Sequence, residues 1–208
     1  MDRIPRDFYL RSAVEAAPEL LGKKLVHKTE NGICSGMIVE VEAYAGAADK
    51  GAHSFGNRRT PRTEIMFGEG GFSYVYSIYG MYYCFNIVVN SAEKPECVFI
   101  RAVEPIDGIE QMKLRRKCEK ITDLCSGPGK LCTALGINKE CYGLDLLGDT
   151  LYIEEFQTIP KEQIRVSPRI NIDYAEECAD YLYRFFLKDN KFVSKVAKRY
   201  RNDRALNE

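Results

Sequence analysis

The sequence predicts a mixed α/β (α+β) fold in which one domain, residues 1–208, contains an antiparallel sheet and several helices. No change in composition along the chain marks a boundary between two domains. Five segments have the residue pattern of strands, and short turns join two pairs of them, as in antiparallel hairpins. Segments with helical periodicity lie before and after these strands. The 45% of hydrophobic residues is enough to fill a substantial core.

The first predicted element is a short helix that begins after Ser12. Ser12 and Glu15 have the spacing of a capping box, in which each side chain accepts a hydrogen bond from the other residue's backbone N–H. The apolar periodicity ends at Gly22, and glycine is common just beyond a helix C-terminus. Pro18 interrupts the periodic segment, so the pattern leaves the length of this helix open.

The first two strands are predicted at residues 24–29 and 33–44. The turn between them contains Asn31-Gly32, a strong hairpin signal because both residue types adopt positive φ. A loop rich in small and basic residues, 45–63, comes next. It connects this hairpin to the rest of the predicted sheet.

Three more strands are predicted further along the chain, at residues 72–79, 82–90 and 96–103. Gly80 lies between the first two, where a tight turn is expected. Because consecutive strands are joined by short connections, the sheet is predicted to be antiparallel.

Helices are predicted in three later segments, at residues 106–120, 127–137 and 174–188. The last of these is amphipathic. Residues 191–204 carry six basic residues and one acidic residue, Asp203. Such a segment is either an arm that contacts phosphates or the solvated end of a helix.

Charge and cysteine content say more about the compartment than about the partner. Thirty basic residues balance 30 acidic ones, so net charge neither identifies nor excludes a polyanionic partner. Eight cysteines without an N-terminal hydrophobic signal segment predict reduced thiols in a cytoplasmic protein. No apolar run reaches the ~20 residues of a membrane-spanning helix, so no membrane partner is expected. Two histidines and no C-x-x-C pair make a zinc site improbable.

One face of the predicted strand carries two carboxylates and a tyrosine. The period of two puts Glu40, Glu42 and Tyr44 on the same face as Ile38. This face is either an ordinary solvent face or part of an active site. The glycine-rich loop that follows favours a site, since active sites form where a rigid strand meets a loop. An ionised carboxylate there can act as a general base on water.

The loop 45–63 contains one histidine and a basic turn. His53 has no second histidine near it in sequence, so it is either a structural hydrogen-bonding residue or part of a ligand site. Arg58, Arg59 and Arg62 flank a Thr-Pro pair. Such a turn suits phosphates, although an ordinary charged surface explains it equally well.

The segment YVYSIYGMYYCFN holds five tyrosines between residues 74 and 83 and ends at Asn86. Aromatic strand residues usually belong to a core or a sheet surface. Each buried tyrosine hydroxyl must find a partner, however, which makes tyrosine an unusual choice for a dry core. A flat ligand such as a nucleobase, on which the rings stack, explains the choice better, and Asn86 has the donor and acceptor to read a base edge.

Seven motifs occur in order between about Leu20 and Leu147. They are LLGKKLV, VEVEAYAG, DKGAHS, TPRTEIMFGEGGFSYVYSIYGMYYCFNIV, VFIRAVEP, GPGKLCTALGI and GLDL. Together they closely resemble the alkyladenine (3-methyladenine) DNA glycosylase family. The resemblance implies the family's fold, one mixed α/β domain with a curved antiparallel β-sheet and surrounding helices. After Leu147, where RINI and YLYRFF depart from the family pattern, it implies only the fold.

The resemblance implies a base-excision-repair enzyme. Such a DNA glycosylase flips alkylated or deaminated purines, of the 3-methyladenine, hypoxanthine or ethenoadenine type, out of duplex DNA. It hydrolyses the N-glycosidic bond with a glutamate-activated water and leaves an abasic site. Double-stranded DNA that contains damaged purines is then the partner, and the protein is expected to be a monomer that is associated with the nucleoid when it acts. Neither a metal nor a cofactor is implied.

The resemblance also implies roles for single residues. The glutamate of the E-A-Y motif, here Glu42, is the general base, and Tyr79 matches the residue that wedges into the duplex. The remaining pocket positions fall on Tyr44, His53 and Tyr76, which stack around the base, on Asn86, which clashes with the amine of guanine, and on Arg101, near the target phosphate. A methylated purine is cationic and is attracted to electron-rich ring faces.

Two rival functions use the same residues differently. In a sugar-polymer hydrolase, Glu40 and Glu42 form an acid and nucleophile pair, but neighbours at i and i+2 on one strand aim in parallel and flank a bond poorly. In a non-enzymatic nucleic-acid binding module, the rings and basic turns bind the ligand and Glu42 is dispensable. Release of bases from alkylated DNA separates all three functions.

Overall fold

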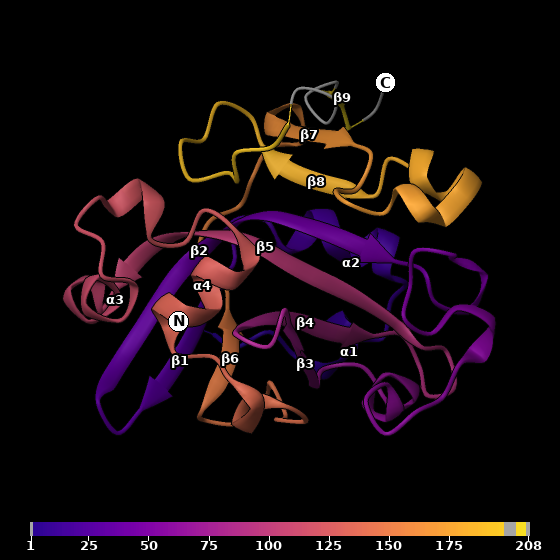
Figure 1. Cartoon of the computed structure of the whole chain (residues 1–208), viewed down its shortest axis with the longest axis horizontal. Helices are drawn as coiled ribbons and strands as arrows, with labels where there is room; N and C mark the ends of the chain where they lie inside the picture. The colour runs from indigo at the N-terminus through magenta and orange to yellow at the C-terminus, as the bar shows by residue number, and fades with distance from the viewer. Residues whose placement is uncertain (1, 198–202, 207–208) are drawn as a thin grey trace.

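The computed structural model describes residues 2–197 and 203–206, and its central element is a nine-stranded antiparallel sheet (Figure 1). The strands are β1 (Lys24–Thr29), β2 (Gly32–Tyr44), β3 (Ser73–Ile78), β4 (Tyr82–Val89), β5 (Glu96–Asp107), β6 (Leu151–Glu154), β7 (Ile164–Ser167), β8 (Arg184–Leu187) and β9 (Arg204–Ala205). The predicted single α+β domain is confirmed. All five predicted strands are present; β6 to β9 were not predicted.

Helices are short in this fold. The α-helices are α1 (Arg6–Tyr9), α2 (Ala13–Leu20), α3 (Ile109–Arg116) and α4 (Pro128–Leu135). Short 3₁₀ turns are η1 (Gly46–Ala48), η2 (Phe55–Asn57), η3 (Glu64–Phe67), η4 (Ile121–Asp123), η5 (Lys139–Cys141), η6 (Lys161–Gln163) and η7 (Asp173–Asp180). In the described ranges, no helix is both long and apolar enough to cross a membrane.

The long strand β2 organises the sheet. It pairs with β5 along one edge, while its other edge pairs first with β1 and then, at Glu40–Glu42, with β8. The strand order β3-β4-β5-β2-β8-β7-β9 therefore continues on both sides of β2, and β6 extends the sheet from β1. Because β8 pairs with the middle of β2, the chain segments that follow β7 and β8 also lie close to the middle of β2.

The pairing of β2 with β5 is irregular between Ser35 and Gly36 and again between Ile38 and Val41, where the irregularity concerns the site. Ile38 pairs with Val103 and Glu40 with Ala102, so Val39 has no partner; Val41 then pairs with Ile100, which leaves Arg101 without one. An extra residue on each strand is the mark of a β-bulge, which bends the strand and re-aims side chains. This irregularity lies beside both glutamates that the sequence singled out.

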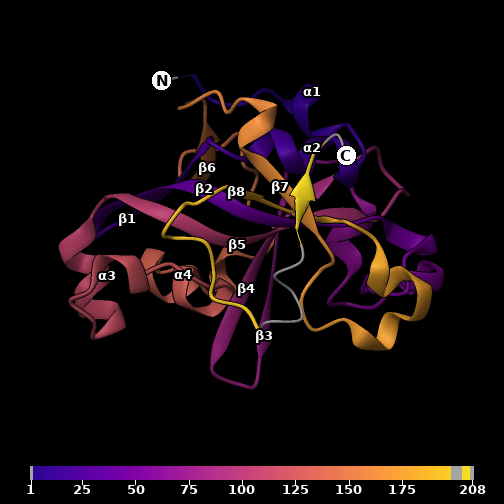
Figure 2. The same ribbon diagram turned by 90° about the horizontal axis from the view of Figure 1, so that it is seen from above.

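Helices cover both faces of the sheet. Helix α2 packs on β2 and β5, whereas α4 packs on β4 and β5 and α3 packs on α4. Figure 2 shows α1 and α2 on one side of these strands and α3 and α4 on the other. The predicted capping box of α2 is present, with Ser12 and Glu15 bonded reciprocally, and Pro18 lies within the helix without ending it. The core is thus a three-layer packing of short helices around strands.

The helix predicted at 174–188 is wrong. The 3₁₀ turn η7 is broken at Glu176, which has φ 49°, and the strand β8 begins at Arg184. A period of two governs β8, because Phe185 and Leu187 enter the core, and the buried Arg184 pairs with Glu40 on β2. Tertiary pairing with β2 overrides a pattern that also fits a helix.

Two further predictions need adjusting. Strand β5 extends to Asp107, so the helix predicted at 106–120 is shortened to α3. In the basic segment 191–204, residues 198–202 lie outside the described residues. The part before them is not helical, and Phe192 and Ser194 in it are buried. The described part therefore packs on the protein instead of forming a solvated helix.

Candidate active site

The hairpin of β3 and β4 positions the tyrosines. Antiparallel pairing sets Tyr74 opposite Asn86 and Tyr76 opposite Cys84, so alternate residues share a face. At the tip, Tyr79 and Gly80 have φ values of 53° and 70°, which fit a tight hairpin turn. Tyr79 is 84% exposed. Figure 2 shows the hairpin projecting from the body of the molecule.

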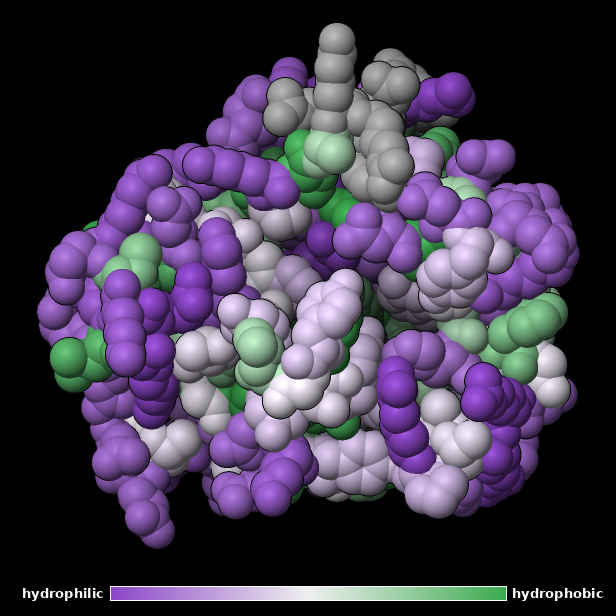
Figure 3. Space-filling model, in the orientation of Figure 1, coloured by the Kyte–Doolittle hydropathy of each residue, from purple (hydrophilic) through white to green (hydrophobic). Residues whose placement is uncertain are grey.

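Beside this hairpin lies a cavity of about 510 Å³. The space-filling view shows this face hollowed near its centre (Figure 3). Six predicted site residues line the cavity: Tyr44, His53, Tyr76, Tyr79, Asn86 and Arg101. Other lining residues are Arg62, Tyr74, Tyr82, Phe99, Ile170, Asn171 and Tyr174. The structure therefore brings together positions that are far apart in the sequence.

One wall of the cavity is aromatic. The rings of Tyr74 and Tyr76 lie 5.3 Å apart, and the imidazole of His53 meets Tyr76 edge-on at 4.8 Å. The hydroxyl of Tyr74 lies 2.9 Å from His53 Nδ1, so this buried hydroxyl has a polar partner. Each ring is thus held by a neighbour, and the wall is preorganised for a flat ligand.

Tyr44 also lines the cavity, and Arg169 packs against its ring. The guanidinium of Arg169 lies 4.6 Å from the centre of the Tyr44 ring. Arg169 is fully buried, donates to the carbonyl of Ala43 at 3.0 Å and forms a bidentate pair with Asp49. A buried bidentate pair has little freedom, so the Tyr44 ring has a fixed backing.

Glu42 lies behind the lining of the cavity, in a buried network of glutamates and their partners that we call the floor, and it is fully buried. The hydroxyl of Tyr44 donates to its Oε2 at 3.0 Å, and the backbone N–H of Ile170 donates to its Oε1 at 2.8 Å. Arg101 Nη1 lies 3.2 Å from the same Oε1. Glu42 does not itself line the cavity, but the three residues that hold its carboxylate do.

Glu40 lies deeper and is also fully buried. Its Oε1 accepts from Arg101 Nε at 2.9 Å and from Arg184 Nε at 2.8 Å, while Ser194 donates through its N–H at 2.7 Å and its hydroxyl at 2.8 Å. Arg101 therefore bridges the two glutamates. The solvent-face alternative for these carboxylates is wrong, because both point into a buried network.

The surroundings shift several pKa values. Burial alone would raise the pKa of Glu40, but Arg101, Arg184 and the bonds from Ser194 outweigh it, so the pKa is lowered. Burial raises the pKa of Tyr44 well above 10, with a further contribution from Glu42. Burial and the nearby charges of Arg62 and Arg58 lower the pKa of His53 to about 4. At neutral pH, Tyr44 is therefore a hydrogen-bond donor and His53 is uncharged.

Asn86 is buried on the cavity wall. Its side-chain NH₂ donates to the carbonyl of Tyr74 at 3.1 Å, and its Oδ1 faces the thiol of Cys97 at 3.8 Å. These contacts fix the orientation of the amide. The side chain is therefore a rigid part of the wall, with little room to move aside for a larger ligand.

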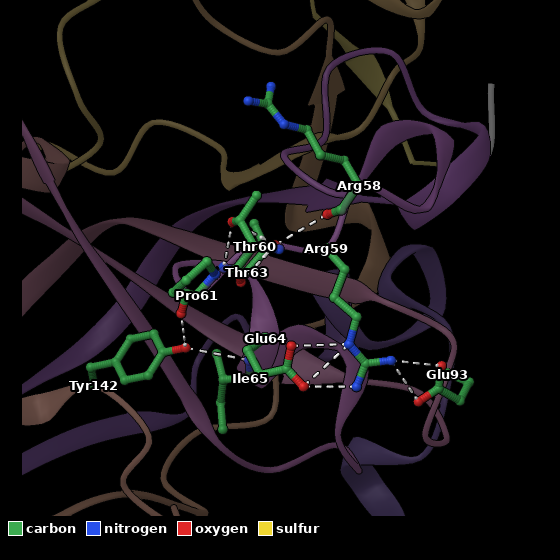
Figure 4. Close-up of polar contacts among 9 residues, drawn as sticks. All are labelled: Arg58, Arg59, Thr60, Pro61, Thr63, Glu64, Ile65, Glu93 and Tyr142. Carbon is green, nitrogen blue, oxygen red and sulfur yellow. Dashed lines mark hydrogen bonds and ion pairs between the residues drawn. The ribbon is translucent and has the colours of Figure 1, made fainter.

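The basic turn 58–62 is not one positive surface. Figure 4 shows the side chain of Arg59 in ion pairs with Glu64 and Glu93, whereas Arg58 extends away from these residues. Arg62 instead turns to the cavity, where its Nε donates to the Tyr74 hydroxyl at 3.2 Å. The three arginines therefore have different surroundings, and Arg59 is neutralised locally.

Sequence reasoning missed the residues that support the site from the C-terminal part of the chain. Arg169, Ile170, Arg184 and Ser194 contact residues between 40 and 49 across more than 100 positions. No local spacing signals such contacts, and the backbone N–H of Ile170 carries no residue signature at all. The RINI stretch departed from the family pattern, which hid the role of Arg169. In the residues that the structure describes, no cluster of three or more His, Cys, Asp or Glu could hold a metal ion.

Comparisons with known proteins identify the family. A family model described as methylpurine-DNA glycosylase matches residues 7–191. Relatives from Clostridium novyi (strain NT), Bacillus cereus (strain G9842) and Clostridium acetobutylicum are 49%, 51% and 50% identical over 207, 204 and 204 residues. These matches cover 94%, 92% and 94% of this chain and 100%, 98% and 99% of the relatives. All three relatives carry the name "Putative 3-methyladenine DNA glycosylase".

Proposed function

The chain belongs to the methylpurine-DNA glycosylase family and is a DNA glycosylase, and on that premise we propose that it flips damaged purines out of duplex DNA and hydrolyses their N-glycosidic bonds with a Glu42-activated water. The product is an abasic site. The observation that carries the proposal is the place of Glu42, whose carboxylate is held by Tyr44, Arg101 and Ile170 directly beneath the aromatic cavity.

The hydrogen bonds of Glu42 leave it able to act on a water. A carboxylate has about four acceptor positions. Oε1 accepts from Ile170 and faces Arg101, whereas among the described residues Oε2 accepts from Tyr44 alone. Oε2 therefore keeps an acceptor position for one proton of a water that attacks C1′. The same negative charge stabilises the sugar cation that develops as the base leaves.

The cavity supplies recognition. Tyr44 on one side and Tyr76 with His53 on the other form the ring faces between which an extruded purine stacks, at ~1 to 3 kcal/mol per stacked base. Tyr79, at the exposed tip of the hairpin, fills the gap that the purine leaves in the duplex. Arg101 supports Glu42 and lines the cavity near the target nucleotide.

The rigid amide of Asn86 excludes guanine. An exocyclic amine at position 2 of the purine would meet this side chain, which hydrogen bonds hold in place. Asn86→Ser should therefore relax discrimination against guanine. Release of guanine is measured by chromatography after incubation with undamaged and alkylated DNA. An unchanged yield from both would remove Asn86 from the pocket.

Family membership decides against the two rival functions. The sugar-polymer hydrolase also fails on geometry, because both carboxylate oxygens of Glu40 already accept hydrogen bonds from Arg101, Arg184 and Ser194. The non-enzymatic binding module leaves Glu42 without a use, although three donors are arranged around its carboxylate.

The test uses duplexes that each contain one lesion: a methylated adenine, hypoxanthine or ethenoadenine. Strand breaks are scored after alkali, and we expect them for at least one lesion, with no break before alkali because the enzyme is monofunctional. Borohydride trapping of a protein–DNA adduct would contradict a water nucleophile. EDTA should not change the yield, and a strict metal requirement would show that the site has been misread.

A further inference from the structure

Arg62 lies on the rim of the base cavity and touches three of its rings. Its Cζ lies 4.6 Å from the centre of the Tyr76 ring, its Nε donates to the Tyr74 hydroxyl at 3.2 Å, and its Nη2 lies 3.0 Å from His53 Nε2. These contacts hold a planar cation against the aromatic wall. The rest of the residue is exposed, so its environment will change when DNA covers the mouth of the cavity.

No carboxylate among the residues that the structure describes is paired with Arg62. Two arginines line the cavity, and the other one, Arg101, is paired with both Glu40 and Glu42. Arg62 makes no ion pair with any residue in the ranges 2–197 and 203–206. The neighbouring Arg59 shows the contrast, because it is paired with two carboxylates. Arg62 therefore adds a net positive charge beside the place where the base stacks.

Damaged purines differ in how they respond to such a charge. When the C1′–N9 bond breaks, its electron pair goes to the purine, the water oxygen bonds to C1′ and Glu42 takes a proton from that water. A cationic methylated purine leaves as a neutral base. A neutral purine, such as hypoxanthine or ethenoadenine, leaves with negative charge. A fixed cation at the rim stabilises the negative charge that develops on a neutral purine as it leaves. The same cation repels a cationic methylated purine.

We propose that Arg62 is a specificity-determining residue that shifts the enzyme toward uncharged damaged purines and away from cationic ones. The inference rests on the proposed function and adds the substrate class that the pocket favours. The guanidinium acts from the aromatic wall that the purine itself contacts. A purely structural arginine or an arginine bound to a phosphate would affect both classes of lesion equally.

The experiment compares single-turnover excision from two substrates. One is a duplex with a single ethenoadenine or hypoxanthine, and the other is DNA methylated with dimethyl sulfate, whose purines are cationic. Arg62→Gln removes the charge but keeps an amide that can donate to Tyr74. We expect the excision rate of the neutral base, divided by that of the cationic base, to fall by about tenfold. This value is modest because the side chain is exposed and solvent screens its charge.

Two further variants separate charge from structure. Arg62→Lys keeps the charge and should retain most of the parent ratio. Arg59→Gln removes one charge from the same loop at a side chain that is paired with Glu64 and Glu93 and does not line the cavity, and should leave the ratio unchanged whatever it does to DNA affinity. An equal fall for both substrates in Arg62→Gln, or no change in their ratio, would overturn the inference. If the parent protein released neither class of base, the proposed function would fail instead.

Discussion

The floor of the cavity and its rim are built in opposite ways. At the floor, Glu40 and Glu42 are fully buried, and their oxygens are fixed by donors from β2, β5, β8 and the segments that follow β7 and β8. At the rim, Tyr79 is 84% exposed on a projecting turn, and the described part of the chain holds Arg62 only through rings and a hydroxyl.

This difference separates two tasks. Chemistry needs charges held within a fraction of an ångström, and a buried network provides that. Recognition needs groups that meet a large duplex, and a projecting hairpin and loop provide that. Floor variants should therefore change the chemical step or the stability, and rim variants should change base extrusion and lesion choice.

The largest effect is expected from Glu42→Gln at the floor. The amide can hold a water but cannot accept its proton, so single-turnover excision should fall by about a hundredfold to ten-thousandfold. Binding to a lesion duplex, measured by fluorescence anisotropy, should stay close to the parent value. Glu104→Gln, on β5 outside the cavity, is the matched control. A loss of less than about tenfold would remove Glu42 from the role of base.

Glu40→Gln should act on stability as well as on rate. Removing one charge from a buried ion-pair network costs about 3 to 5 kcal/mol, because Arg101 and Arg184 lose their common partner. For a chain of this size the Tm should fall by about 6 °C or more in calorimetry. A Tm within about 2 °C of the parent protein would mean that the network tolerates a neutral side chain.

The pH dependence of stability tests whether the ionised form of Glu40 stabilises the folded protein. The folded protein lowers the pKa of Glu40 below 4.5, so its ionised form stabilises the protein above that pH, and the contribution is lost as pH falls through the folded pKa. The parent protein and Glu40→Gln should therefore converge in stability at acid pH. Denaturant unfolding at several pH values measures this, and parallel curves down to pH 3 would contradict the sign.

At the rim, Tyr79→Ser should reduce extrusion without affecting the floor. Loss of a contact worth ~1 to 3 kcal/mol cuts the extruded population by roughly 5- to 150-fold. The fluorescence of ethenoadenine reports the flipped base before any bond breaks. The loss should be smaller for a mismatched or single-stranded lesion, where extrusion costs less. Complete flipping by Tyr79→Ser would make Tyr79 an ordinary surface residue.

The smallest effect is a shift in one titration. His53 should remain uncharged down to a pKa of about 4, because burial and the charges of Arg62 and Arg58 disfavour its protonation. Arg62→Gln should raise that pKa toward 6.5. Nitrogen chemical shifts of the imidazole in a pH titration measure both values. An unperturbed pKa in the parent protein would mean that Arg62 does not lie against this ring in solution.

The sequence predicts the rim of the cavity better than its floor. The rim residues belong to short motifs, and the hairpin with Gly80 between 72–79 and 82–90 was predicted from turn chemistry alone. Glu42 and Tyr44 were singled out by the period of their strand and received roles from the family resemblance. Tyr44 and the other cavity rings now line one cavity, and Glu42 is bonded to Tyr44 behind it. Their individual roles stay predictions. The five strands between residues 24 and 103 were predicted well because two pairs of them, β1–β2 and β3–β4, are hairpins with local turns.

The rest depends on contacts that local patterns do not encode. Strand β8 was predicted as a helix because its sequence has the apolar spacing of both, and only its pairing with Glu40–Glu42 decides between them. Arg169 and Asp49 form an ion pair across 120 positions, so neither residue predicts the other. Ser194 is an ordinary serine until Glu40 lies beside it.

The long-range contacts at the floor also set an order of events during synthesis. Ile170, Arg184 and Ser194 reach back to Glu42 and Glu40 across 128, 144 and 154 positions. Contacts of such separation form late, because the intervening chain must be ordered first. A ribosome-bound chain that ends before residue 170 has the motifs of the rim but cannot position its carboxylates. The protein thus becomes able to cleave N-glycosidic bonds in DNA only when its last strands have docked on β2.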